Sequence, residues 1–312
     1  MADLHPKDAS YAASAQKTGS PGPVLINREH ASKLVGRQSR GSKRGFSKRS
    51  IAMFVVAVLT FVVLAAPSPY VVETPGPTQD VLGSSNGKQV IAISGTQVYE
   101  TKNGGKLLLT TVNAAGIPGA PVSGLETLIN WVNPHATVLP KEVIFPPGQS
   151  REQYLEDNKK DMTGSQDSAT TQALKFLEGK GTDTSGIKVN MHVDDIGGPS
   201  AGLMYALGTI DKLTEQDETG GQVIAGTGTM EEGGKVGRIG GIQLKMLGAK
   251  RDGATWFLAP AGNCGEVVGH VPEGLRDVRV TTLSDAYEAL TKISQNEADT
   301  LPHCTASKTT TE

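Results

Sequence analysis

The chain has 312 residues, a length typical of one or two domains. Its 30 Lys and Arg nearly balance its 32 Asp and Glu, but residues 1–50 contain ten Lys and Arg and only three Asp and Glu. This segment therefore carries +7, which leaves −9 for residues 51–312. Such an asymmetry is typical of a nucleic-acid-binding tail or of the flank of a membrane span. The apolar run that follows the basic segment excludes a nucleic-acid partner, and the spacing of Cys and His predicts no metal site.

Residues 1–48 are rich in Ser, Gly, Lys and Arg without helical or strand periodicity, which predicts a disordered tail. Residues 50–72 contain no charged side chain and are long enough to cross a bilayer core of about 30 Å as a helix. Lys and Arg cluster before this segment, so we expect a cytoplasmic N-terminus and an extracytoplasmic remainder. We favour an uncleaved signal anchor in the cell membrane over a cleaved signal peptide, because the basic lead is longer than the roughly 15–30 residues of a signal peptide.

Residues 73–86 are rich in Pro, Gly and Ser and are expected to form a linker. The following residues 87–295 alternate between strand and helix patterns, which predicts one mixed α/β (α+β) domain. A polar C-terminal tail, residues 296–312, is expected after it. We expect strands at 89–94, 97–101, 105–112, 187–193, 222–230, 255–261 and 279–283, a hairpin turn at 103–105, a glycine-rich hairpin at 233–241, and helices at 124–132, 151–178, 199–213, 241–254 and 284–294, the last capped by Ser284.

Ser200 follows Gly197, Gly198 and Pro199 and opens a strongly apolar helix pattern. The first N–H groups of a helix have no partner within the helix, and the helix dipole favours negative charge there. A nucleophilic serine beside an oxyanion hole needs such a position. Serine is also a favoured helix cap, so this segment alone is better explained by an ordinary cap.

A nucleophilic serine needs a base. None of the six histidines lies in a helpful motif, although His192 stands on the strand expected before Ser200. The other candidate is Lys245, which follows the glycine-rich hairpin near the start of a helix. A lysine acts as a base only when it is neutral, which requires burial, whereas most lysines on helices are solvated. The residues alone leave the choice of base open.

The segments GGPSAGL, TGT, GKVGRIGGIQLK and GATWFLAP occur in this order and spacing. Together they resemble the proteolytic domain of Lon proteases, over about residues 89–294. That family uses a Ser–Lys dyad, with the serine in a G-P-S-A-G segment and the lysine in a G-x-I-G-G-x-x-x-K segment. The resemblance implies that Ser200 is the nucleophile, Lys245 the general base and Thr227 a support for the lysine, with backbone N–H groups of Gly198, Ser200 and Ala201 forming the oxyanion hole.

Three departures from Lon proteases stand out. No G-x-x-x-x-G-K-[ST] motif occurs, so we expect no ATP cofactor. Many Lon enzymes have an acidic residue three positions before the serine, where this chain has Gly197, and Asp195 is out of register. The anchor and the YVVETPGPTQDVLG segment also resemble membrane-anchored, secreted Lon-like bacterial proteins that carry a PDZ domain. In this chain the insertion that would hold that domain, near residues 178–190, is expected to be absent.

Cys264 and Cys304 are the two cysteines. An extracytoplasmic compartment is oxidising, which favours a disulfide that ties the C-terminal tail to the domain. The alternative is a pair of free thiols.

Together these features predict a membrane-anchored, extracytoplasmic serine endopeptidase that hydrolyses peptide bonds of proteins without an ATPase of its own. The alternative is a non-catalytic interaction or assembly module that keeps the Lon fold at the membrane. Expected partners are protein or peptide substrates, the lipid bilayer through residues 50–72, and further copies of the chain in a ring.

Overall fold

The computed structural model describes residues 47–101, 103–192 and 197–306, so almost all of the expected tail 1–48 lies outside the described residues. Helix α1, Lys48–Ala65, has 18 residues and a mean hydropathy of 2.0. Among the described residues it is the one helix long and apolar enough to cross a membrane, a criterion that a signal sequence also meets. The span expected over 50–72 is too long, because the helix stops before Pro67 and a strand begins at Tyr70. The chain divides into two units between Phe54 and Val55, and the domain lies in the second.

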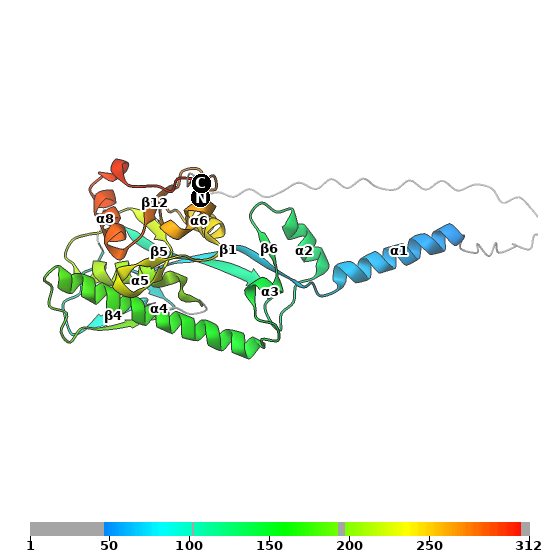
Figure 1. The fold of residues 1–312 in the computed structure, drawn as a ribbon, viewed down its shortest axis with the longest axis horizontal. Coiled ribbons are helices and arrows are strands. Elements are labelled where there is room, and N and C mark those ends of the chain that lie inside the picture. Colours follow the sequence, from blue (N-terminus) through cyan, green and yellow to red (C-terminus); the bar gives the residue numbers. More distant parts are fainter. Residues whose placement is uncertain (1–46, 102, 193–196, 307–312) are drawn as a thin grey trace, which may run out of the picture. The chain divides into compact units, whose positions relative to one another are not determined.

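A six-stranded mixed sheet forms the centre of the domain (Figure 1). Its strand order is β12-β11-β8-β5-β1-β6. The first four strands are mutually parallel, whereas β1 runs antiparallel to both β5 and β6. The strands are β1 Tyr70–Asp80, β5 Lys106–Ala115, β6 Thr137–Pro140, β8 Val223–Gly226, β11 Trp256–Pro260 and β12 Arg276–Val280.

In the described residues, three short antiparallel pairs and seven α-helices complete the domain. The pairs are β2 Ser84–Ser85 with β3 Lys88–Gln89, β4 Ile91–Ser94 with β7 Lys188–Met191, and β9 Thr229–Met230 with β10 Val236–Gly237. The α-helices are α2 Gly124–Trp131, α3 Lys141–Ile144, α4 Arg151–Gly179, α5 Gly202–Leu213, α6 Ile242–Arg251, α7 Cys264–Val267 and α8 Leu283–Ser294.

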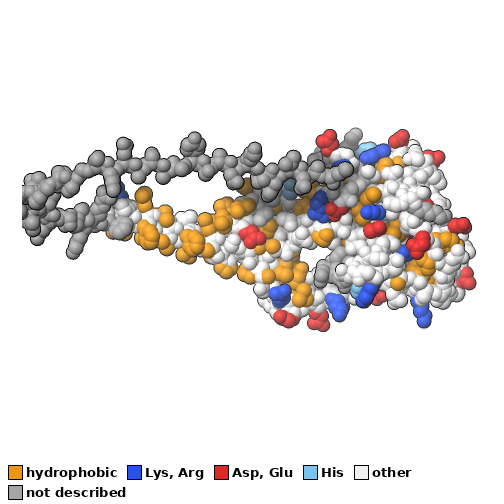
Figure 2. Space-filling model, turned by 180° about the vertical axis from the view of Figure 1, so that it is seen from behind, with side chains coloured by type: hydrophobic (Ala, Val, Ile, Leu, Met, Phe, Trp, Pro, Cys, Tyr) orange, Lys and Arg blue, Asp and Glu red, His pale blue; other side chains and the backbone are white. Residues whose placement is uncertain are grey.

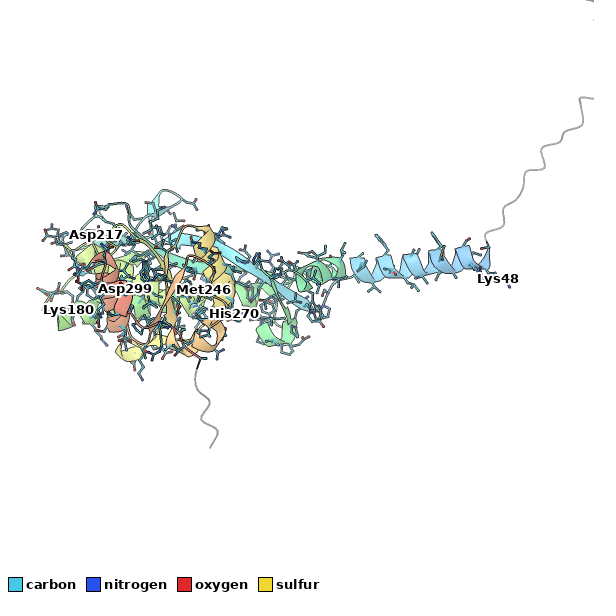
Figure 3. All side chains as sticks on the ribbon, turned by 90° about the horizontal axis from the view of Figure 1, so that it is seen from above. Lys48, Lys180, Asp217, Met246, His270 and Asp299 are labelled. Carbon is cyan, nitrogen blue, oxygen red and sulfur yellow. A yellow bond between two sulfur atoms is a disulfide. The ribbon has the colours of Figure 1, made fainter. Side chains whose placement is uncertain are left out.

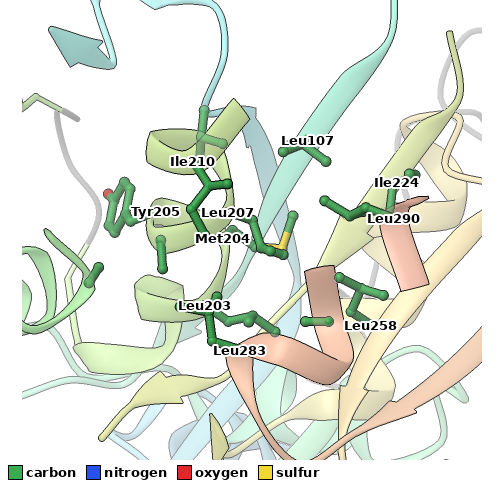
Figure 4. Packing of buried hydrophobic residues seen from close by; sticks show 14 of the residues in the cluster. Leu107, Leu203, Met204, Tyr205, Leu207, Ile210, Ile224, Leu258, Leu283 and Leu290 are labelled. Atoms are coloured by element: carbon green, nitrogen blue, oxygen red, sulfur yellow. The ribbon is translucent and has the colours of Figure 1, made fainter. Parts of the chain in front are cut away.

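Helices cover both faces of the sheet. Successive side chains of a strand point to opposite faces. Accordingly, Leu107 and Leu109 of β5 pack in one apolar cluster with α4, α5 and α8, and Leu108 packs in a second cluster with α6 and α7. All twelve residues of α5 are buried, and Figure 4 shows its apolar side chains among those of the sheet and α8. Because α5 and α6 lie on opposite faces, side chains from both can meet only at an end of the strands.

The linker expected over residues 73–86 is wrong. Residues up to Asp80 belong to β1, which pairs with β5 on one edge and β6 on the other. Pro75 and Pro77 fall where the pairing with β5 shifts register, between Pro75 and Thr78. A proline lacks the N–H that a regular ladder needs, and a β-bulge accommodates it.

The strand expected over residues 97–101 is also wrong. The Tyr99 N–H donates to the Lys212 carbonyl, and the Thr101 hydroxyl donates to Asp211, so this segment is held by the end of α5. The turn at Asn103 therefore leads into β5 without forming a hairpin.

Helix α8 is capped by Thr282 rather than by Ser284. The Thr282 hydroxyl accepts the Asp285 N–H, and the Asp285 carboxylate accepts the Thr282 N–H, a reciprocal capping box. The expected helices at 124–132, 151–178 and 241–254 are confirmed with ends shifted by at most three residues.

Candidate active site

Ser200 lies in a short 3-10 turn, Pro199–Ala201, that leads directly into α5. The preceding Gly198 has a φ of 84°, which favours glycine at this entry. The Ser200 carbonyl accepts the Gly228 N–H at 2.9 Å and the Thr227 hydroxyl at 3.0 Å. The backbone of the serine is therefore held by the loop that follows β8.

Lys245 comes from the other face of the sheet. Its helix α6 starts after Gly241, whose left-handed φ of 68° suits a glycine. The side chain is 3% exposed, and its Nζ lies 2.6 Å from Ser200 Oγ and 3.1 Å from Thr227 Oγ1. Figure 3 labels its neighbour Met246 on the same helix within the domain. The three predicted side chains thus meet at the carboxyl end of β8, the edge where open α/β sheets bind ligands.

Burial lowers the pKa of Lys245 to about 7, because a desolvated ammonium is disfavoured. The negative charge of Glu73 opposes this shift. Near neutral pH the amine is therefore partly in its neutral form, which can accept the proton of the serine hydroxyl.

Glu73 is a site residue that the sequence reasoning missed. It lies on β1 and lines the same cavity as Ser200 and Lys245. Burial raises the pKa of its carboxyl, while the charge of Lys245 pulls that pKa down. The sequence does show an acidic residue directly after the apolar YVV run, but residues 73–86 were expected to form a linker, so Glu73 was not considered.

The cavity at Ser200 has a volume of about 640 Å³. Residues Thr110 to Asn113 of β5 form one part of its wall, and Arg238 and Ile239 form another. Strand β5 pairs with β8 only over Lys106–Leu109, whereas its pairing with β1 continues to Ala115. An extended chain can therefore lie beside β5 past the end of β8.

The expected oxyanion donors differ in their surroundings. Gly198 donates its N–H to the Asn158 carbonyl of α4 at 3.4 Å. Ser200 and Ala201 lie within the first turn, where helical N–H groups have no partner inside the helix. Of the alternatives weighed from sequence, Lys245 is the side chain that bonds to Ser200 Oγ, whereas His192 lines a second cavity. Asp195 lies outside the described residues.

Cys264 and Cys304 form a disulfide, with their Cα atoms 4.9 Å apart. The C-terminal segment runs beside β12, where the Arg279 N–H donates to the Pro302 carbonyl. Next to the disulfide, the buried Asn263 side chain accepts the Ile239 N–H at 3.0 Å and donates to the Ile239 carbonyl at 2.8 Å. The bridged region thereby supports one wall of the cavity. Among the described residues, no group of three or more His, Cys, Asp or Glu could hold a metal ion.

Residues 120–294 match the family model of the Lon protease (S16) C-terminal proteolytic domain. The chain belongs to this family. It is 36% identical over 104 residues to the Lon protease of Clostridioides difficile, and 37% identical over 98 residues to the mitochondrial Lon protease homolog of Eremothecium gossypii. These matches cover 32% and 30% of this chain, but only 13% and 9% of the relatives. The domain is thus a serine-type peptidase domain of the Ser–Lys kind, and the predicted resemblance to the Lon proteolytic domain is confirmed.

Proposed function

We propose that the chain is a membrane-anchored, extracytoplasmic serine endopeptidase in which Ser200 is the nucleophile and Lys245 the general base. The observation that carries this proposal is the 2.6 Å separation of Lys245 Nζ and Ser200 Oγ at a buried position. A lysine placed there cannot act as ordinary surface charge, and hydrogen-bond reach is the first requirement for a general base.

In the proposed reaction, neutral Lys245 takes the proton of Ser200 as Oγ attacks the carbonyl carbon of a peptide bond. The resulting ammonium returns this proton to the amine that leaves, which gives an acyl-enzyme and a free N-terminus. Lys245 then deprotonates a water molecule that hydrolyses the ester and regenerates Ser200. Thr227 accepts a hydrogen bond from Nζ at 3.1 Å and so fixes the direction of the amine.

For the oxyanion we propose the N–H groups of Ser200 and Ala201 as the main donors. Both lie where the helix dipole of α5 favours a developing negative charge. The Gly198 N–H is engaged with Asn158, so we assign it the smaller part.

The proposed anchor is α1, with the preceding Lys and Arg on the cytoplasmic side. The chain connects α4 to β7 through the short segment 180–187, so we propose that it lacks the PDZ module of the membrane-anchored Lon-like proteins that it resembles. We further propose that copies assemble into a ring, and that hydrolysis needs no ATPase module of the chain's own.

Labelling of the full chain with a serine-reactive phosphonate probe tests the assignment. The parent and Ser284→Ala, which alters an exposed serine on α8, are expected to react, and Ser200→Ala is expected not to react. A folded parent that neither reacts with the probe nor cleaves an unfolded protein would favour the non-catalytic module instead.

A further inference from the structure

Helix α2 turns its apolar side outward. Leu125, Leu128, Ile129 and Val132 follow the spacing i, i+3, i+4 and i+7, which places them on one helical face. In a water-soluble domain such a stripe normally faces the core. Here the four side chains are between 47% and 81% exposed.

Away from the stripe, α2 carries small and polar residues. Thr127 is buried, and its hydroxyl donates to the carbonyl of Ser123, the N-cap of the same helix, at 3.0 Å. Gly124 packs so closely that an added Cβ would lie 2.7 Å from the Val63 carbonyl oxygen of α1. A larger residue does not fit at Gly124 without a shift of the backbone, so this side of α2 lies directly against the end of α1.

The stripe begins where the proposed anchor ends. The Gly124 N–H donates to the Ala66 carbonyl at 3.0 Å, and the Ser68 N–H donates to the Val122 carbonyl at 2.8 Å. A β-bridge joins Pro67 to Ser123 between these two bonds. Figure 1 shows α2 beside the end of α1, and Figure 2 shows hydrophobic side chains along α1 and on the adjoining surface.

Length and aromatic content also point to a membrane surface. At 1.5 Å per residue, the 18 residues of α1 rise about 27 Å, slightly less than a hydrocarbon core of roughly 30 Å. Trp131, 61% exposed, packs edge-on against Tyr70, with ring centroids 5.5 Å apart. Trp and Tyr are enriched at the boundary between headgroups and acyl chains.

We propose that the apolar stripe of α2 and Trp131 lie in the outer leaflet of the membrane, at the boundary between headgroups and acyl chains. This inference rests on the proposed anchoring through α1. The lipid would cover the apolar face that the domain leaves open. An interfacial helix lies roughly 5–10 Å deep in the membrane, so α2 would add this depth to the span of the short helix α1. The bonds at Ala66 and Ser68 join the end of α1 to the start of α2.

Tryptophan fluorescence of the full chain in lipid vesicles tests this placement. The chain has two tryptophans, and Trp256 is buried with the Arg276 guanidinium 4.1 Å from its ring centroid. Trp256→Phe therefore isolates the emission of Trp131. We expect blue-shifted emission that lipids brominated near the headgroup end of the acyl chain reduce about twofold, and lipids brominated near the chain end reduce less. If Trp256→Phe fails to fold, the difference between the parent and Trp131→Phe gives the same signal.

Carbonate extraction of the same vesicles separates the two proposals. A chain that resists extraction but whose Trp131 emits as in water, without quenching by brominated lipid, keeps the anchor and overturns the placement of α2. Blue-shifted emission without quenching, together with crosslinking between copies through α2, would assign the stripe to a second copy of the chain and also overturn it. A chain that carbonate extracts overturns the anchor and this placement together.

Discussion

Helices α2 and α5 both carry an apolar stripe with helical spacing, but they face opposite surroundings. In α5, Leu203, Leu207 and Ile210 are fully buried between the sheet, α4 and α8. In α2, Leu128 and Ile129 are more than half exposed. The comparison shows that periodicity identifies an apolar face but does not identify what covers it. For α5 the cover is the rest of the domain, and for α2 we propose that it is lipid.

The packed core around α5 and α6 also sets the protonation state of Lys245. The same layers that enclose α5 and α6 remove water from the amine and lower its pKa to about 7. The proposed lipid cover of α2 has no such effect, because it leaves the pKa of a lysine that faces water unchanged. The largest effects should therefore follow changes on the buried side.

Lys245→Arg should have the largest effect, a loss of roughly 10²–10⁴-fold in kcat/KM, because arginine stays protonated and cannot act as a base. Cleavage of a fluorescently quenched unfolded protein measures it. Lys250→Arg is the matched control on α6, since among the described residues the Lys250 ammonium donates to the Gly274 carbonyl and not to Ser200. Equal activity of the folded Lys245→Arg variant and the parent would remove Lys245 from the mechanism.

Leu207→Ala and Leu128→Ala test the two helices directly. The first opens a cavity in the core and should lower the free energy of unfolding by about 2–5 kcal/mol. The second removes atoms that touch little of the domain and should change it by no more than about 0.5 kcal/mol. Urea unfolding in mild detergent measures both. Similar costs for the two variants would mean that α2 packs against protein.

Cys304→Ser should lower the free energy of unfolding by about 2–4 kcal/mol, because the disulfide closes a long loop. The emission of Trp131 should stay unchanged, since the described buried residues that pack with the disulfide include none from α2. Thermal unfolding and fluorescence of the same samples check both parts. A variant as stable as the parent would show that the disulfide does not hold the domain.

The resemblance to the Lon proteolytic domain pointed to Ser200, Lys245 and Thr227 together, whereas the residues by themselves left the choice of base open. Glu73 could not be predicted, because Pro75 and Pro77 made a central strand look like a linker. The bulge that admits these prolines depends on strand pairing with β5, which composition does not reveal.

The general plan of the fold was also predictable, because the helices of the domain have clear periodicity. The end of α1 was missed, since Tyr70, Val71 and Val72 are as apolar in a strand as in a span. The outward face of α2 was missed as well. The close approach of Gly124 to Val63 of α1 joins residues far apart in the sequence, and no local pattern encodes such a contact.

The pH dependence of Ser200 labelling by the phosphonate probe tests the central claim most directly. The base form of Lys245 is the neutral amine, so its population rises with pH through a pKa of about 7. The labelling rate should increase nearly tenfold per pH unit below that value and level off above it. Glu73→Gln removes the charge that holds this pKa up, and should move the midpoint to lower pH. A rate that still rises with a midpoint near the roughly 10.4 of a free lysine, or that does not depend on pH, would contradict the account.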